Sequence, residues 1–345
     1  MSKICILGGG LVGRFVACEL LRRNHEILLI DAEKIENLPN GIAVLKSHID
    51  PDSIRELISG YKIIVNCLPG RIGHAIREPL LSIEGLSIAD LAFTAEDPRL
   101  IDKLAKKNRC RLIYDVGIAP GLSNALLKSA QNKLGVLDSA QIWVGGNPQK
   151  QDEEWSYMAP FSPSDVIEEY TRPARIRRNG KNVTEPALSN LHVITVPGYG
   201  LMEAFLTDGV RSLLDTIDSK ELLEYTVRWP GHIEKYISGD YSEEELIKAW
   251  KFDPKRPEFT WLAVTATKGD EIQSWNVIDE GLEGWSSMAR TTGLVTVEVA
   301  EILAEGLVKE FGVFPPEYLG DDELLLDRIV NKMQDLGVRI TLDSN

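Results

Sequence analysis

The feature that most constrains the fold is a glycine-rich turn between an apolar run and a helical pattern near the start of the chain. Residues 4–16 read ICILGGGLVGRFV, in which residues 8–13 fit the pattern G-x-G-x-x-G. The first glycine permits a tight turn, the second lets the backbone approach a pyrophosphate, and the third lets the helix pack closely on the sheet. The helix N-terminus favours the phosphate charge. The turn predicts a dinucleotide site, with contacts from Gly8, Gly10, Leu11, Val12 and Gly13.

The first 115 residues alternate short apolar runs with amphipathic helical patterns. Such alternation is typical of βαβ units around a buried parallel sheet. Six runs are present, as many as the strands of a complete dinucleotide-binding sheet. The runs are KICIL (3–7), EILLI (26–30), GIAVL (41–45), KIIVN (62–66), LSIAD (86–90) and RLIYD (111–115). We therefore predict an α/β fold with a doubly wound parallel Rossmann sheet.

An acidic residue follows the second apolar run at the spacing that a dinucleotide site requires. Asp31 lies eighteen residues beyond Gly13, where a carboxylate can accept hydrogen bonds from both ribose hydroxyls and would repel a 2′-phosphate. The next residues, AEK, offer no arginine cluster for that phosphate. The pattern predicts NAD as the cofactor. The alternative interpretation is a glycine-rich turn that binds no ligand.

Three further strand ends supply candidate contacts, because ligands of such sheets lie at the carboxyl edge. Leu68, Pro69 and Gly70 follow the fourth run and form either a wall of the cofactor site or a plain strand-to-helix turn. Asp90 ends the fifth run and either contacts the nicotinamide region or caps a helix. Asp115 ends the sixth run, before VGIAPGLSN, and either orients an amine or a water or caps that loop.

The later part of the chain has a different pattern. All seven tryptophans lie at or after Trp143, and hairpin signals join the apolar runs at Asn179-Gly180 and at residues 268–270. This predicts a second, α+β domain with a mostly antiparallel sheet. The expected boundaries are 1–120 for the Rossmann domain, 121–289 for the second domain and 311–345 for a C-terminal segment, with a helix at 290–310 packing back on the first domain.

Charge and cysteine usage exclude several classes of protein. The net charge of −14 argues against a nucleic-acid or anionic-membrane partner, since both require a basic face. No apolar run reaches the ~18–20 residues that span a bilayer. The four cysteines match neither a metal motif nor a disulfide framework, so no metal is expected and a reducing cytoplasm fits best.

Several longer segments carry a family resemblance over nearly the whole chain. They are GGGLVG (8–13), DVGIAPGLSN (115–124), VGGNP (144–148), FSPSDVIEEYTRPARIRRNGK (161–181), EAFLTDGVRSLLDTI (203–217), RWPGH (228–232) and VFPPEYLG (313–320). With them the chain resembles the lysine 6-dehydrogenase branch of the saccharopine dehydrogenase/reductase-like oxidoreductases. Asn147 departs from the leucine expected in the VGGNP segment. The resemblance implies a homodimer that oxidises an amine carbon with NAD, most specifically the ε-amine of L-lysine, giving 2-aminoadipate 6-semialdehyde, which cyclises.

That chemistry sets requirements for the site. The amine must be neutral before hydride leaves its carbon, and lysine's pKa of ~10.4 makes this costly without a base. The substrate carboxylate favours an arginine, and its α-ammonium favours a carboxylate. The candidate base residues are Asp115 and His232, although His232 is alternatively a neutral hydrogen-bond donor or a structural loop histidine.

The substrate-binding candidates come from the second domain. Arg211, in a helical pattern, and Arg228, beside Trp229, are candidates for the carboxylate, or else form surface salt bridges. Glu203 either faces the α-ammonium or is a solvated acid, and Arg172 contacts substrate, a dimer interface or a cap.

Two other functions stay open on the sequence. The same scaffold suits a saccharopine or carboxynorspermidine dehydrogenase, which condenses an aldehyde with an amino acid reductively. The first thirty residues alone also resemble nucleotide-sensing regulatory modules. The aromatic-rich second domain argues against this last reading.

Overall fold

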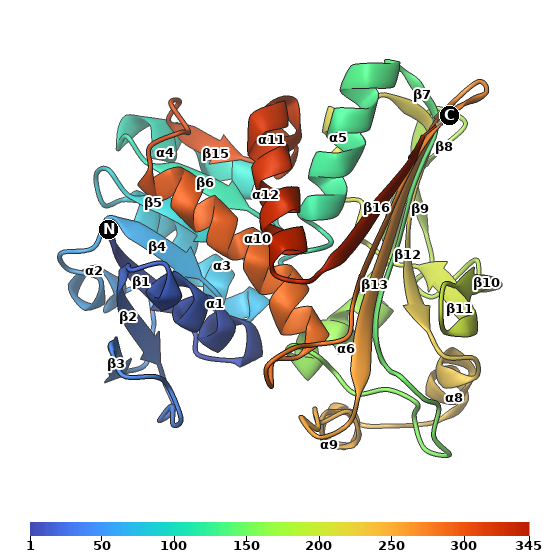
Figure 1. Ribbon diagram of the computed structural model, residues 1–345, viewed down its shortest axis with the longest axis horizontal. Helices are drawn as coiled ribbons and strands as arrows, with labels where there is room; N and C mark the ends of the chain where they lie inside the picture. Colours follow the sequence, from blue (N-terminus) through green and yellow to red (C-terminus); the bar gives the residue numbers. More distant parts are fainter. Residues whose placement is uncertain (345) are drawn as a thin grey trace. The chain divides into compact units, whose positions relative to one another are not determined.

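The computed structural model describes residues 1–344, which form two compact units. The first unit consists of Met1–Gly117 and Thr292–Tyr318. The second consists of Ile118–Thr291 and the C-terminal residues from Leu319 onward. Each unit contains one large sheet with helices packed on it (Figure 1).

The first unit is built on a seven-stranded, all-parallel sheet in the order β15-β6-β5-β4-β1-β2-β3. The strands are β1 (Lys3–Leu7), β2 (Glu26–Asp31), β3 (Ile42–Lys46), β4 (Ile63–Asn66), β5 (Ser87–Asp90), β6 (Arg111–Tyr114) and β15 (Gly312–Phe314). The six predicted strands are present in the 3-2-1-4-5-6 order of a Rossmann sheet, which confirms the predicted fold class. The sequence interpretation missed β15, because three residues carry no periodic signal.

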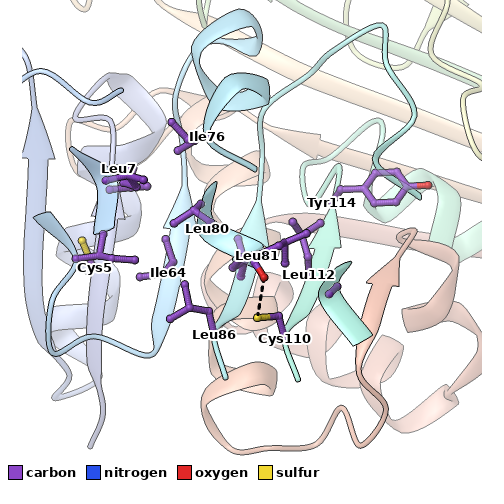
Figure 2. Close-up of a cluster of buried hydrophobic side chains, with 14 of the residues drawn as sticks. Cys5, Leu7, Ile64, Ile76, Leu80, Leu81, Leu86, Cys110, Leu112 and Tyr114 are labelled. Carbon is purple, nitrogen blue, oxygen red and sulfur yellow. Dashed lines mark hydrogen bonds between the residues drawn. The ribbon is translucent and has the colours of Figure 1, made fainter. Parts of the chain in front are cut away.

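Helices follow most strands of this unit. They are α1 (Leu11–Arg22), α2 (Ile54–Leu57), α3 (Gly70–Leu81), the 3₁₀ turn η1 (Pro98–Ile101) and α4 (Asp102–Lys107). Cys5, Ile64 and Leu112 of the strands pack against Ile76 and Leu80 of α3 in one buried cluster (Figure 2). Cys110 belongs to the same cluster, and its thiol lies 3.7 Å from the carbonyl oxygen of Leu81. Cys5 and Cys110 are therefore small core residues of this cluster.

Helix α10 (Ser287–Ala304) covers the other face of the sheet together with α1 (Figure 1). A Cβ on Gly293 would lie 2.4 Å from Phe15, so the small residue allows the two helices to approach closely. Arg23 pairs with Glu298 and, at 2.6 Å, with Glu301. The helix starts before the expected residue 290 and ends before 310, because Gly306 takes a φ of 68° just beyond it.

The second unit is built on a nine-stranded sheet whose main path runs β10-β11-β12-β7-β13-β14-β16, with β8 attached to β12 and β9 to β8. Only β12 and β7 pair in parallel, which confirms the prediction of a mostly antiparallel sheet. The strands are β7 (Leu137–Pro148), β8 (Ala174–Arg178), β9 (Lys181–Glu185), β10 (His192–Val196), β11 (Gly200–Leu206), β12 (Ser219–Arg228), β13 (Glu258–Lys268), β14 (Glu271–Asp279) and β16 (Arg339–Ser344).

Both predicted hairpins of this sheet are present. Asn179 and Gly180 take φ values of 49° and 73° between β8 and β9, as a primed two-residue turn requires. Gly269 takes a φ of 57° between β13 and β14. The sequence predicted these turns because only a few residue types tolerate such backbone angles.

The helices of the second unit include one that is much shorter than expected. They are α5 (Leu122–Leu134), α6 (Pro163–Thr171), α7 (Leu213–Thr216), α8 (His232–Ser238), α9 (Glu243–Ala249) and α12 (Glu323–Asp335), and α11 (Glu317–Asp321) precedes α12. The helical pattern over DGVRSLLDTI was mostly wrong, since only four of its residues form α7. Arg211 takes a φ of 51°, which a helix does not allow, so it lies before α7 and not in its first turn.

Candidate functional site

The glycine turn of the first unit has the geometry of a ligand cradle. Gly8 takes a φ of 96°, and a Cβ there would lie 2.7 Å from the carbonyl oxygen of Cys67. A Cβ on Gly13 would lie 2.0 Å from the carbonyl oxygen of Gly8. A Cβ on Gly10, by contrast, would have no atom within 4 Å. Gly8 and Gly13 are thus required by the turn itself, whereas Gly10 borders open space at the N-terminus of α1.

Leu11 and Val12 follow as the first residues of α1, and Val12 is buried. The backbone amide groups of this first turn have no partner within the helix. An anionic ligand over Gly10 would therefore face N–H groups and the positive end of the helix dipole.

The carboxylate of Asp31 is held against this turn. Its Oδ2 accepts a hydrogen bond from the Gly9 amide at 2.6 Å, and its Oδ1 accepts one from the Glu33 amide at 2.8 Å. A Cβ on Gly9 would lie 2.0 Å from Ile35, so this loop packs tightly beside the turn. Each carboxylate oxygen keeps a second lone pair with which it can accept a further hydrogen bond.

The residues after β4 form the start of α3. Pro69 is the N-cap of this helix and Gly70 its first residue. Leu68 is half-buried against the core cluster, and its amide lies 3.4 Å from Asn66 Oδ1. These positions are those of a strand-to-helix turn at the carboxyl edge of the sheet, next to the glycine turn in strand order.

Asp90 lies in a fully buried ion-pair network at the end of β5. Its Oδ2 accepts a hydrogen bond from Arg77 Nε at 2.5 Å, and its Oδ1 accepts from Asn66 Nδ2 at 2.9 Å. Arg77 of α3 also donates to Thr94 and to the carbonyl of Ala92. Burial raises the pKa of Asp90 above its ordinary value, although the Arg77 guanidinium opposes that shift. In this arrangement Asp90 fastens β4, β5 and α3 to one another.

Asp115 follows β6 at the same edge of the sheet. Its side chain is 2 % exposed and its φ is 54°, a conformation that acidic residues adopt more readily than most others. The next amide, of Val116, donates to the carbonyl oxygen of Asp90 at 3.3 Å. The negative charge of Asp115 contributes to the raised pKa values of Asp90 and Tyr114. The structure thus brings Asp90 and Asp115 close together.

A buried guanidinium lies at the centre of the second unit's polar residues. Arg228, the last residue of β12, is 3 % exposed and donates from Nε to the hydroxyl of Tyr170 at 2.8 Å. Its Nη2 donates to the hydroxyl of Tyr157 at 3.4 Å, and its Cζ lies 4.5 Å from the centre of that ring. Among residues 1–344 no carboxylate lies within ion-pair distance of it, so its nearest partners are aromatic rings and neutral oxygens.

This guanidinium fixes the state of His232. Arg228 Nε can only donate, so the Tyr170 oxygen accepts from it and gives its own hydrogen to His232 Nε2, 3.1 Å away. Nδ1 of His232 then donates to the carbonyl of Trp155 at 3.0 Å. Burial, reinforced by the charge of Arg228, lowers the pKa of His232 to about 3. The imidazole is therefore neutral and its lone pair is already in use.

The other predicted substrate residues are tied to the ends of β11 and α6. Glu203 of β11 lies opposite Arg228 of β12 in the strand register. Its Oε2 accepts a hydrogen bond from the Gly231 amide at 3.1 Å. Arg172 lies directly after α6. It forms ion pairs with Glu168, at 3.1 Å, and with Asp208, at 4.0 Å. Arg211 is 7 % exposed. The structure therefore groups Arg228, His232 and Glu203, and places Arg172 beside the loop that leads to Arg211.

Sequence reasoning missed a chain of four side chains next to this group. Thr207 Oγ1 lies 2.8 Å from Thr226 Oγ1, Thr226 hydrogen-bonds Glu169, and Thr207 hydrogen-bonds Glu224. Burial, with the charge of Glu169 adding to it, raises the pKa of Glu224 to about 8. The available signal was an acid at an inward position of the run LEYTVR, which reads as an ordinary strand.

Residues 1–344 contain neither a metal-binding cluster nor a membrane-spanning helix. No group of three or more His, Cys, Asp or Glu side chains in residues 1–344 is arranged to hold a metal ion. No helix found there has the length and apolarity needed to cross a membrane. A hollow of about 560 Å³ in the second unit is bordered by Tyr199, Glu280 and Arg339 and contains none of the predicted site residues.

Comparisons with known proteins agree with this architecture. Residues 117–239, about a third of the chain, match the family model of the saccharopine dehydrogenase C-terminal domain. Among solved structures, saccharopine dehydrogenase (L-Glu forming) from Saccharomyces cerevisiae is similar over 100 % of both chains, with 13 % identity and a TM-score of 0.70. This likeness shows the fold: a Rossmann-like parallel sheet with a second, mixed-sheet domain.

Two other solved structures are more distant. An engineered D-amino acid dehydrogenase bound to NADP⁺ has 10 % identity and a TM-score of 0.46, over 96 % of this chain and 99 % of its own. The diaminopimelate (DAP) dehydrogenase of C. glutamicum, in complex with DAP, has 10 % identity and a TM-score of 0.45, over 96 % and 98 % of the chains. Likenesses of this degree support no inference about this chain.

Proposed function

We propose that this protein is an NAD-dependent oxidoreductase that oxidises an amine carbon of an amino acid, most specifically the ε-amine of L-lysine. The observation that carries the proposal is the glycine turn of a Rossmann sheet with open space at Gly10 and a carboxylate fixed beside it. The match of residues 117–239 to a saccharopine dehydrogenase domain supports an amino-acid substrate.

In this proposal the first unit holds NAD. The turn residues bind the pyrophosphate, Asp31 accepts hydrogen bonds from the adenosine ribose, and Leu68, Pro69 and Gly70 border the cofactor. NAD supplies the hydride acceptor. Because Asp31 carries negative charge at the ribose position, a 2′-phosphate would be repelled, so the proposal includes a preference for NAD over NADP.

The second unit binds the amino acid. Arg211 is proposed for the α-carboxylate, with Arg172 beside it, and Glu203 for the α-ammonium. Of the two predicted acid–base residues, Asp115 is proposed to orient the water that attacks the oxidised carbon. His232 orients Tyr170 and thereby Arg228, since its own lone pair is occupied. We also propose that the protein acts in the cytoplasm as a homodimer.

A second candidate function is favoured by one observation. The matching family model is that of saccharopine dehydrogenase, whose chemistry joins an amino acid to an aldehyde. A saccharopine or carboxynorspermidine dehydrogenase is therefore the alternative on the same scaffold.

The experiment combines the purified protein with NAD and L-lysine and follows the absorbance of reduced nicotinamide. Other amines, and condensation pairs with reduced cofactor, are tested beside it. We expect turnover with lysine. Turnover with a condensation pair alone would replace lysine oxidation by the second candidate, and NAD binding without any turnover would favour a nucleotide-sensing module.

The cofactor assignment has its own test. Asp31→Ala is expected to weaken NAD binding, measured by calorimetry, while the matched variant Asp52→Ala, at an exposed acid of the same unit, leaves it unchanged. Equal NAD affinity in Asp31→Ala and wild type would remove Asp31 from the site.

A further inference from the structure

Two carboxylates of the second unit are connected through a pair of threonine hydroxyls. Glu169 of α6 hydrogen-bonds Thr226 of β12, Thr226 lies 2.8 Å from Thr207, and Thr207 hydrogen-bonds Glu224. The two threonines and Glu224 are all nine-tenths or more buried, whereas Glu169 is only half-buried. This hydrogen-bonded chain of four side chains therefore runs from an accessible acid, Glu169, to a buried acid, Glu224.

The hydrogen count of this chain has one consequence. Three oxygen–oxygen links need three hydrogens, and the two threonine hydroxyls supply two. The third can come only from a carboxyl group. We infer that Glu169 and Glu224 share a single proton through Thr226 and Thr207, and that Glu169 is the end at which protons enter and leave.

The surroundings decide where the proton rests. Glu224 is 3 % exposed, and within residues 1–344 only Thr207 and the Gly209 amide, at 3.2 Å, hydrogen-bond its carboxyl group. Burial and the charges of Glu169 and Asp208 raise its pKa to about 8. Asp208 itself is paired with Arg175 at 2.7 Å. The neutral, protonated form of Glu224 is therefore favoured at pH 7.

Glu169 interacts with a buried cation. Its negative charge contributes to the raised pKa of the Arg228 guanidinium. Tyr157 and Tyr170 are buried phenols whose pKa values are raised, so both are neutral near pH 7. The resting state is thus a Glu169 carboxylate joined by two hydroxyls to a protonated Glu224.

This arrangement deepens the proposed function and rests on it. Oxidation of an amine requires that its ammonium first lose a proton. The N–H bond breaks with its electron pair staying on nitrogen, and the proton forms an O–H bond on Glu169. In the resting state Glu224 is protonated, so the proton leaves from Glu169 to water. Where Glu224 is unprotonated, Glu169 gives its proton to Thr226, Thr226 gives its own hydroxyl proton to Thr207, and Thr207 gives its hydroxyl proton to Glu224. Thr226, Thr207 and Glu224 are positioning residues, because they act through Glu169.

Infrared spectroscopy of the resting protein tests the shared proton without any substrate. The wild-type minus Glu224→Gln difference spectrum at pH 7 is expected to contain the C=O stretch of a protonated carboxyl, lost as pH rises through about 8. In Glu169→Gln the midpoint of that loss is expected to fall, because the repelling charge is gone. Absence of the band, or an unchanged midpoint in Glu169→Gln, would overturn the sharing.

Kinetics test the role of the chain. Thr226→Val keeps the shape of the side chain and removes the hydroxyl. We expect its pH profile to shift and its kcat to fall at least about tenfold above pH 8, where Glu224 can take up the proton, with KM little changed. Thr226→Ser, which keeps the hydroxyl, should restore kcat and the pH profile to their wild-type values. The matched control is Thr265→Val, which removes a hydroxyl bonded at 2.9 Å to Ser274 on the same sheet. Equal kcat and pH profile in Thr226→Val and wild type would overturn the proton-transfer role.

The two tests separate this inference from the proposed function. A protein that oxidises no amine refutes the proposed function and the proton-transfer role together, while the infrared band still decides whether the two acids share a proton. Turnover that is insensitive to Thr226→Val upholds the proposed function and refutes the transfer role alone.

Discussion

At the scale of single residues, the buried guanidinium of Arg228 determines the protonation of two neighbours. Its Nε makes the Tyr170 oxygen an acceptor, which in turn makes His232 Nε2 an acceptor. A histidine held in this way contributes to stability only in its neutral form. The unfolded chain has no such preference, so the folding equilibrium must depend on pH through this residue.

The first prediction concerns that pH dependence. The folded pKa of His232 is about 3 and its ordinary value is 6.5, so below pH 6.5 the unfolded state takes up a proton that the folded state refuses. The contribution of His232 to stability is present above pH 6.5 and is lost as pH falls, by ~1.4 kcal/mol per pH unit. His232→Asn has no such loss. Urea unfolding followed by tryptophan fluorescence should show the stability gap between wild type and variant narrowing by roughly 2 kcal/mol from pH 6.5 to 5. A gap that stays constant contradicts the neutral assignment.

The second prediction concerns the buried pair in the first unit. Arg77→Met leaves Asp90 buried without its cation, which costs about 3–5 kcal/mol. Urea unfolding followed by labelling of the cysteine thiols measures this loss. The matched control is Lys34→Ala, which removes an exposed ion pair with Glu36 and is expected to cost at most about 1 kcal/mol. Equal costs for the two variants would mean that the Arg77 network is not structural.

These residues show what the sequence can and cannot predict at this scale. The position of Asp31 beside the glycine turn could be predicted, because its spacing from that turn is set by the length of one helix and one strand. Glu224 and Arg77 were not found, because a buried acid in a strand and a buried base in a helix look like surface residues until their partners are known. Arg77 and Asp90 are 13 residues apart in the sequence, and Glu224 and Thr207 are 17 apart. A local sequence pattern therefore does not identify these partners.

At the scale of elements, the turn from β1 to α1 contains glycines of two kinds. Gly13 is required by packing, since a Cβ there would lie 2.0 Å from the Gly8 carbonyl oxygen. Gly10 has a φ of −67°, which any residue adopts, and no atom lies near its missing Cβ. The fold therefore does not need a glycine at position 10, and a bound pyrophosphate would.

The third prediction follows from this contrast. Gly10→Ala is expected to leave the free energy of unfolding within about 0.5 kcal/mol of wild type and to weaken NAD binding strongly. Gly13→Ala should destabilise the first unit, because backbone must move to admit the methyl group. Thermal unfolding and calorimetric NAD titration of both variants measure these effects. Unchanged NAD affinity in a folded Gly10→Ala protein would contradict a pyrophosphate at this turn.

Elements were predictable where their signal is periodic and long. The six Rossmann strands and the two hairpins follow from apolar runs and turn residues. The helix expected over DGVRSLLDTI failed for a tertiary reason: Gly209 lies so close to Glu224 that a Cβ would be 2.5 Å from its carboxyl carbon. That contact holds the loop in place, and Arg211 then breaks the helical path with its positive φ.

At the scale of the whole molecule, two residue types separate between the units. All four cysteines lie within Met1–Gly117, and all seven tryptophans lie within Ile118–Thr291. Burial raises the pKa of the Cys5 thiol to about 12, so it reacts slowly with thiol reagents until the first unit opens. Trp155 and Trp250 lie in the core cluster of the second unit. Thiol labelling and tryptophan fluorescence therefore each report on one unit.

The last prediction uses these two probes on the same samples. Each unit has a hydrophobic core of its own, so each is expected to respond to changes in that core. Arg77→Met should lower the urea midpoint of thiol labelling more than that of tryptophan fluorescence, and His232→Asn should do the reverse. Wild-type protein provides the reference for both curves. If both midpoints fall by equal amounts in both variants, the chain unfolds as a single cooperative body, and the two compact units are a feature of geometry without separate stabilities.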